Sequence, residues 1–183
     1  MGLISFFQKR NLKKAQASNQ RQKVMKNLME MKSLLVLCSV NSMEEWEKWQ
    51  RYFENRIYNF SKIQLVVFIQ DKNLKEKPKS ISADLFIPME VSWTGMPKDK
   101  QSIKKYISDH YDLVIDLNFD DIFVLNWILV NSAATLKVGA GIRNEVHEFY
   151  DLIIKTETAN KQPKLYIDQV FYFLQQINEN GHK

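Results

Sequence analysis

From residue 33 onward, short strand-like runs of apolar residues alternate with stretches in which apolar residues recur every three or four positions. The runs are typical of strands buried on both faces and occupy 34–40, 63–69, 84–93, 112–117, 136–138 and 150–155. The helical stretches occupy 42–56, 99–110, 122–134 and the segment opened by Pro163. Strand–helix alternation indicates right-handed βαβ units and a mostly parallel sheet. We therefore expect an α/β fold, a single Rossmann-like three-layer domain over residues 33–183.

The first 32 residues follow a different pattern. From Ile4 to Met31 there is no proline and no internal glycine, and good helix formers dominate, so we expect one long helix. Val24, Leu28 and Met31 stand at helical spacing and should pack on the domain. The middle, Gln8 to Lys23, has almost no apolar face. Because an isolated helix of this kind is marginal in water, we expect it to be ordered only against a partner.

Charge is strongly segregated along the chain. Residues 1–32 hold eight basic residues and one acidic residue, whereas residues 33–183 hold 18 basic and 20 acidic residues, so the net charge of +5 comes from the N-terminal segment. We call residues 1–32 the basic arm. Residues 1–29 contain no acid, and their seven basic residues are Lys9, Arg10, Lys13, Lys14, Arg21, Lys23 and Lys26. A local positive field of this kind indicates an anionic partner.

The favoured partner is structured RNA. Lysine and arginine contact phosphates without reading sequence, so we expect no DNA specificity. Seven neutralised phosphates would give a slope of log affinity against log salt on the order of −5 to −6. The function expected is that of a non-catalytic, cytoplasmic protein that docks on rRNA and neighbouring ribosomal proteins. Trp93, beside the turn at 94–97, is a candidate for stacking on a base or for the core.

Motifs for catalysis or cofactor binding are absent from the sequence. There is no phosphate-binding loop and no nucleophile elbow. The three histidines, His110, His147 and His182, lack metal-ligand spacing, and Cys38 lies inside an apolar run as an expected inert thiol. We therefore expect no enzyme activity, no metal and no cofactor. No apolar run approaches the roughly 20 residues that span a bilayer, so on these grounds we do not expect a membrane partner.

One alternative is a small nucleotide- or nucleotide-sugar-binding enzyme. Ligands of open α/β sheets bind outside the carboxyl ends of the strands, where Asp116 and Asn118 are expected. Gly139 and Gly141 form the nearest approach to a dinucleotide fingerprint, which lacks its third glycine. The competing interpretation gives Asp116 a backbone amide as partner and makes Asp120 a helix cap. Two further alternatives are a protein–protein adaptor and an interfacial membrane anchor formed by Leu3, Ile4, Phe6 and Phe7.

Two resemblances start from the stretch Tyr111-Asp112-Leu113-Val114-Ile115-Asp116-Leu117, the helix through Trp127, and Leu136-Lys137-Val138-Gly139. Over about 30 residues this stretch resembles one Rossmann-like half of heptosyltransferase-type glycosyltransferases. Those enzymes have two such domains and this chain has room for one, so no catalytic residue is carried over. Most of the chain resembles a family of small Bacteroidota proteins with a basic N-terminal helix. The resemblance implies an α/β fold and suits a lineage-specific large-subunit ribosomal protein of flavobacteria.

Overall fold

The protein has one open sheet in which every strand pair is parallel. Our computed structural model describes residues 3–55, 60–76, 79, 83–141, 148–155 and 162–177. Within these residues the strands are β1 (Ser33–Val40), β2 (Lys62–Ile69), β3 (Asp84–Phe86), β4 (His110–Leu117), β5 (Ala133–Ala140) and β6 (Leu152–Ile154). Their order, β3-β2-β1-β4-β5-β6, is that of a doubly wound Rossmann-like sheet. The predicted α/β fold class is confirmed.

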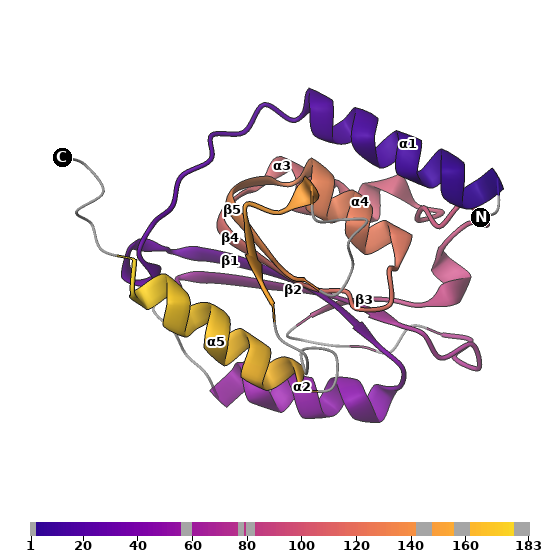
Figure 1. Ribbon diagram of the computed structural model, residues 1–183. Coiled ribbons are helices and arrows are strands. Elements are labelled where there is room, and N and C mark those ends of the chain that lie inside the picture. The colour runs from indigo at the N-terminus through magenta and orange to yellow at the C-terminus, as the bar shows by residue number, and fades with distance from the viewer. Residues whose placement is uncertain are drawn as a thin grey trace.

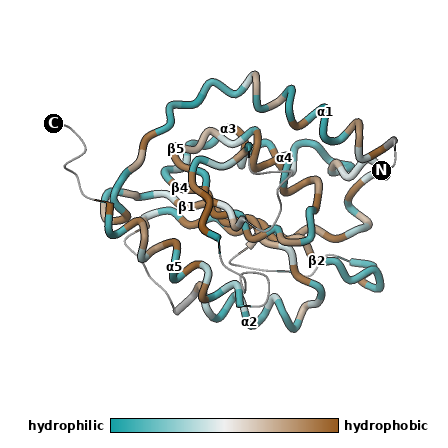
Figure 2. Tube along the Cα trace, in the orientation of Figure 1, coloured by the Kyte–Doolittle hydropathy of each residue, from teal (hydrophilic) through white to brown (hydrophobic). Residues whose placement is uncertain are grey.

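Helices cover both faces of the sheet (Figure 1). On one face lie α2 (Met43–Asn55) and α5 (Pro163–Gln175), and on the other lie α3 (Lys104–Ser108) and α4 (Phe123–Asn131). Alternate residues of a strand enter opposite cores. Val36 and Cys38 of β1 belong to the core under α2 and α5, whereas Leu35 and Leu37 belong to the core under α4. The hydrophobic residues concentrate along the strands between these layers (Figure 2).

The helix of the basic arm, α1 (Leu3–Ser18), lies outside α4 and adds a partial outer layer (Figure 1). Leu12 and Ala15 are buried and share a core cluster with Val124 and Ile128 of α4. The middle of the arm, whose sequence has almost no apolar face, thus buries two apolar side chains one turn apart. Polar side chains around them also bond to the body. Gln8 Nε2, for example, donates to the Thr94 carbonyl at 2.8 Å.

The long helix predicted to Met31 ends at Ser18. Ser18 Oγ donates back to the Ala15 carbonyl at 2.9 Å, and the Asn19 side-chain amide donates to the carbonyls of Val130 (2.7 Å) and Ser132 (3.1 Å). Polar side chains that bond the backbone in this way end helices. Residues 19–27, which we call the connector, have no regular secondary structure and cross the end of α4 and the start of β5.

The base of the arm is a short 3-10 turn, η1 (Leu28–Glu30), closed by a capping box between Asn27 and Glu30. Leu28 and Met31 are buried as predicted, but Val24 is exposed, so the apolar residues at helical spacing do not form one face. Two further 3-10 turns, η2 (Pro88–Glu90) and η3 (Lys100–Ile103), follow β3 and precede α3. The strand expected at 84–93 stops at Phe86, just before Pro88, which lacks the N–H that a strand needs.

We predict that Leu12→Ala loosens α1 without unfolding the sheet. Loss of a buried leucine side chain costs about 2 to 5 kcal/mol, and α1 can detach while the body stays folded. Native-state hydrogen exchange should show amides of α1 exchanging at least about 30-fold faster, with β4 unchanged. Arg10→Ala, on the exposed face of the same helix, is the control. Unchanged exchange in α1 of the Leu12 variant would contradict the packing described here.

Candidate functional site

Three of the seven basic residues predicted to meet phosphates bind carboxylates of the same chain from the connector. Arg21 Nη2 lies 2.7 Å from Asp151 Oδ1, and both side chains are only 9% exposed. Lys23 Nζ lies 3.3 Å from the same oxygen. Lys26 Nζ lies 3.1 Å from Asp112 Oδ1. These residues fix the connector to β4 and to the segment before β6.

Asp151 is the anchor of this arrangement. Its Oδ2 accepts the Lys137 amide at 2.9 Å, while Arg21 Nη1 reaches past it to the Ala134 carbonyl at 3.0 Å. Burial acts to raise the pKa of Asp151, but the hydrogen bonds from Arg21 and Lys137 outweigh it, so the pKa lies below its ordinary value. The carboxylate is therefore ionised and holds Arg21 as a buried structural cation.

Asp112 serves the same purpose at the amino end of β4. Its Oδ2 accepts the amides of Lys32 (2.9 Å) and Ser33 (3.1 Å) as well as Ser33 Oγ (3.0 Å). Burial again acts to raise the pKa, and these hydrogen bonds together with Lys26 lower it below its ordinary value. Asp112 therefore joins the base of the arm to the sheet.

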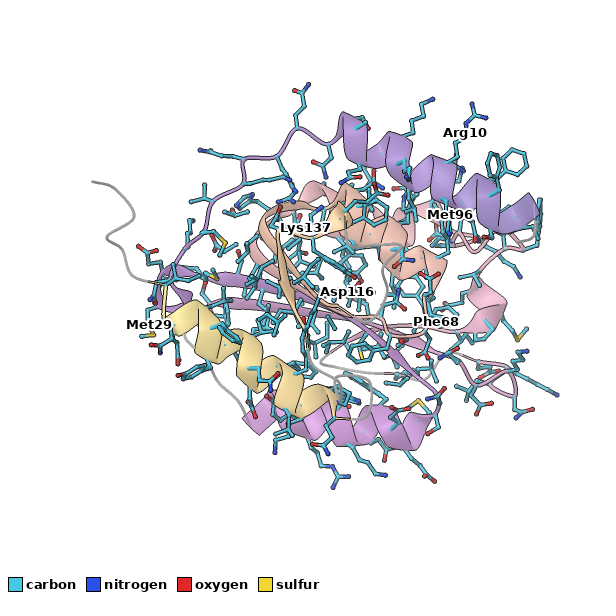
Figure 3. The ribbon with its side chains drawn as sticks, in the orientation of Figure 1. Arg10, Met29, Phe68, Met96, Asp116 and Lys137 are labelled. Carbon is cyan, nitrogen blue, oxygen red and sulfur yellow. The ribbon has the colours of Figure 1, made fainter. Side chains whose placement is uncertain are left out.

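The remaining basic residues lie on α1. Arg10, Lys13 and Lys14 are exposed, and Figure 3 shows Arg10 pointing away from the body. Lys13 lies 3.3 Å from Glu148, an exposed pair of little energetic value. Arg10 and Lys14 have no ion-pair partner among the residues that the structure describes. We call Arg10, Lys13 and Lys14 the outer face of α1. Lys9 is half-buried and lines a groove with Asp121 and Glu148.

An apolar groove opens beside the amino end of α1. Its volume is about 730 Å³, and its apolar lining comes from α1, the 93–96 turn and α4, namely Ile4, Phe7, Trp93, Met96, Phe123 and Trp127. Trp93, a sequence candidate for either stacking or the core, is 80% exposed. The helix α1 therefore contributes residues both to the groove and to the cationic outer face.

The structure brings together Asp116 and Gly139 of the alternative ligand site, which are paired in register on β4 and β5. The Tyr150 ring occupies the space where a side chain on Gly139 would stand, and its hydroxyl donates to Asp116 Oδ2. Asp116 Oδ1 accepts the Asn118 amide at 2.9 Å, as the competing interpretation predicted. Gly141 is similarly close to the Lys155 side chain. This place in the fold is filled by the chain itself.

Asn118 organises the turn that starts α4. Its amide group bonds both the Ile122 carbonyl and the Asn126 side chain, and its Oδ1 accepts the Ile122 amide at 2.9 Å. Asp121 has a φ of 59° and accepts from Asn126 at 2.7 Å. Asp120 accepts Ser39 Oγ at 2.8 Å from β1, so the expectation that it caps α4 is wrong. All these polar groups have structural partners.

The strand order reverses between β1 and β4, the place where ligands of such sheets usually bind. The cavity there is small, about 150 Å³, and is lined by Ser39, Glu45 and Asp120. Its two carboxylates disfavour a phosphate, and the turn after β1 has no glycine. Cys38 is buried at its base, and burial raises the pKa of the thiol far above its ordinary value, so the thiol is inert.

In the described ranges, no group of three or more His, Cys, Asp or Glu residues is placed to bind a metal ion. His110 Nε2 lies 3.1 Å from Thr135 Oγ1. His147 and His182 lie outside the described residues. None of the helices in the described part of the chain is long and apolar enough to cross a membrane.

Lys137 is a buried cation that the sequence did not reveal. It is 2% exposed, and its Nζ donates to the carbonyls of Leu129 and Val130 at the end of α4. Burial lowers its pKa to about 7, and the nearby charge of Arg21 lowers it further than Asp151 raises it. Figure 3 shows Lys137 inside the molecule, beneath the connector. The end of α4 is thus bonded from inside by Lys137 and from outside by Asn19, while Arg21 bonds the start of β5.

The strand order and the helices on both faces of the sheet define a Rossmann-like α/β protein. The turn after β1 has no glycine, so the usual glycine-rich nucleotide-binding loop is absent at that position. The chain belongs to a protein family of unknown function, DUF6913, which matches residues 5–177. No curated protein and no solved structure matches the chain. The match begins inside α1 and ends just after α5, so the arm and the domain belong to the same family unit.

We predict that Lys137 makes stability depend on pH near neutrality. Its folded pKa of about 7 lies below the value of about 10.4 in an unfolded chain. Between these values the unfolded state binds more protons, so the free energy of unfolding rises with pH. From pH 7 to 8.5, wild type should gain about 1 to 2 kcal/mol relative to Lys137→Met in urea unfolding.

The control for this measurement is Lys48→Met, which removes an exposed lysine of α2. Its stability should follow wild type at every pH in the window. A constant difference between wild type and Lys137→Met from pH 7 to 8.5 would show that the buried amine does not titrate there.

Proposed function

We propose that the protein binds structured RNA through the outer face of α1. The observation that supports this most is the docking of an acid-free helix on which Arg10, Lys13 and Lys14 are exposed, with Arg10 pointing away from the body (Figure 3). A helix held in place presents these charges at fixed spacing, and such contacts position a protein on a phosphate backbone without reading sequence. The role proposed is binding, with no catalytic step.

The internal ion pairs reduce the expected number of phosphate contacts. Arg21, Lys23 and Lys26 are held by Asp151 and Asp112, so the proposal assigns them no phosphate contact. Three contacts remain on α1, those of Arg10, Lys13 and Lys14. The proposed salt slope is therefore on the order of −2 to −3, smaller in magnitude than the value for seven contacts.

RNA is favoured over an anionic membrane by the arrangement of α1. An interfacial helix lays a continuous apolar face into the lipid. Here the apolar residues in the middle of the helix, Leu12 and Ala15, are buried against the body. Ile4 and Phe7 line the groove beside Trp93. Exposed apolar side chains are confined to the tip of the helix, at Ile4, Phe6 and Phe7. Along the rest of α1 the exposed face is polar and cationic, which suits phosphates better than acyl chains.

The finer proposal is that the RNA is rRNA of the large ribosomal subunit and that the protein acts in the cytoplasm. It is supported by the likeness to the basic-helix proteins described above and by a charge distribution in which one acid-free helix lies on a nearly neutral domain. Ribosomal particles supply phosphates at high density together with neighbouring proteins for the domain.

We predict that removing the cations of the outer face weakens RNA binding through its salt-dependent part. The triple variant Arg10→Gln, Lys13→Gln, Lys14→Gln should reduce the salt slope by about 2 to 3, because each lost phosphate contact removes about 0.7 to 0.9. Fluorescence anisotropy with a structured RNA at several salt concentrations measures this.

The matched control removes three exposed cations from the opposite layer, Lys48, Arg51 and Lys164, in α2 and α5. It carries the same net charge as the first triple variant and should keep the wild-type slope. Equal slopes for all three proteins would refute the assignment of the binding surface.

The ribosomal setting is tested with the same two variants. In sucrose gradients of native lysate we expect wild type and the control triple variant to sediment with large subunits at moderate salt, and the outer-face variant to remain at the top. Wild-type protein found only at the top of the gradient would rule out the ribosome as partner.

A further inference from the structure

The exposed indole of Trp93 stands on a rigid hairpin loop. Ser92 and Met96 flank three loop residues, and the Ser92 amide donates to the Met96 carbonyl at 2.7 Å. The Gly95 amide donates to the Ser92 carbonyl at 2.9 Å, and Gly95 has a φ of 82°, as hairpins of this length require. A bridge between Val91 and Pro97 closes the hairpin. Trp93 is therefore presented on a closed, hydrogen-bonded loop.

The loop is also fixed to the helices that frame the groove. Gln8 of α1 donates to the Thr94 carbonyl at 2.8 Å. A side chain on Gly95 would come within 2.9 Å of Phe123 Cβ, so the loop backbone packs directly on α4. The position of Trp93 relative to α1 is thereby set before any ligand binds. Preorganisation of this kind reduces the entropy cost of binding.

The lining of the groove fits an uncharged flat ring attached to an anion. Among the described residues that line it, the aromatic side chains are Phe7, Trp93, Phe123 and Trp127, the one ionic side chain is Lys100, and none is a carboxylate. Arg10 lies one turn of α1 beyond Phe7, on the outer face. A nucleobase with its phosphate has this combination of a π-face and a neighbouring negative charge.

We propose that the groove binds an unpaired base of the RNA, stacked on Trp93, while the flanking phosphates contact Lys100 and the outer face of α1. This inference rests on the proposed function and names its substrate class: RNA with a bulge, a loop or a single-stranded end next to a helix. Bases inside an A-form helix do not expose their faces to a protein side chain, whereas unpaired bases stack on aromatic residues. Because the groove is continuous with the outer face of α1, we assign both surfaces to one ligand.

The test compares two RNAs of equal length and charge, one a continuous hairpin stem and one carrying a single bulged purine. Wild type should bind the bulged RNA more tightly. Trp93→Ala should lower affinity for the bulged RNA about 5- to 100-fold and leave affinity for the continuous stem and both salt slopes unchanged. Trp93→Phe, which keeps an aromatic face, should retain most of the preference.

The matched control is Tyr172→Ala, which removes an aromatic side chain that is 60% exposed on α5, in the opposite layer. It should bind both RNAs as wild type does. Because Trp93 is 80% exposed, its variants should fold, and thermal unfolding checks this.

The outcomes separate the two proposals. Equal wild-type affinity for both RNAs, with no effect of Trp93→Ala on either, overturns the base-binding groove and leaves RNA binding by α1 standing. An equal loss on both RNAs also overturns it, because Trp93 would then act by supporting α1. Absence of wild-type binding to either RNA refutes the proposed function and the groove together.

Discussion

The ionised carboxylate of Asp151 holds the arm to the body, and the surface proposed for binding depends on it. It accepts Arg21 at 2.7 Å and the Lys137 amide at 2.9 Å, so connector and sheet share one anion. Beyond the connector, α1 packs on α4 through the buried side chains of Leu12 and Ala15, and Gln8 bonds the Thr94 carbonyl of the neighbouring loop. Arg21 thus fixes the chain just beyond the carboxyl end of a helix whose own hydrophobic contribution is small. The placement of Arg10 on the surface therefore depends in part on this distant ion pair.

Charge counting alone overstated the free positive charge of the arm. Counted by sequence, residues 1–32 carry a net charge of +7. In the folded chain, carboxylates of the domain offset part of it, at Asp151, Asp112 and, weakly, Glu148. Part of the slight negative charge of the domain therefore lies where it pairs with cations of the arm. What remains is a short row of cations on one face of α1, which defines a smaller and better oriented surface than an entire basic tail.

The sequence predicted those parts of the fold that depend on local pattern. Strands such as 34–40 and 112–117 are continuous apolar runs because both their faces are buried, and α2 and α5 have strong start signals at Ser42 and Pro163. The end of α1 escaped prediction because it depends on Asn19 bonding to Val130, 111 residues away. The Tyr150 ring over Gly139 comes from the segment before β6, which no local pattern places there. Lys137 was missed because a lysine inside a strand normally indicates an exposed face. Long-range partners of polar side chains account for each of these failures.

The placement of α1 on α4 has a consequence for synthesis. During translation α1 emerges before α4, and the carbonyls of Val130 and Ser132 that receive Asn19 appear more than a hundred residues later. Until then the cationic helix has no intramolecular docking site. Contacts between segments this far apart form late in folding, since the intervening chain must first be ordered. The arm is thus made well before its docking site and is among the last parts of this domain to be secured, so the nascent protein exposes the positive charge of the arm most fully while it is still attached to the ribosome.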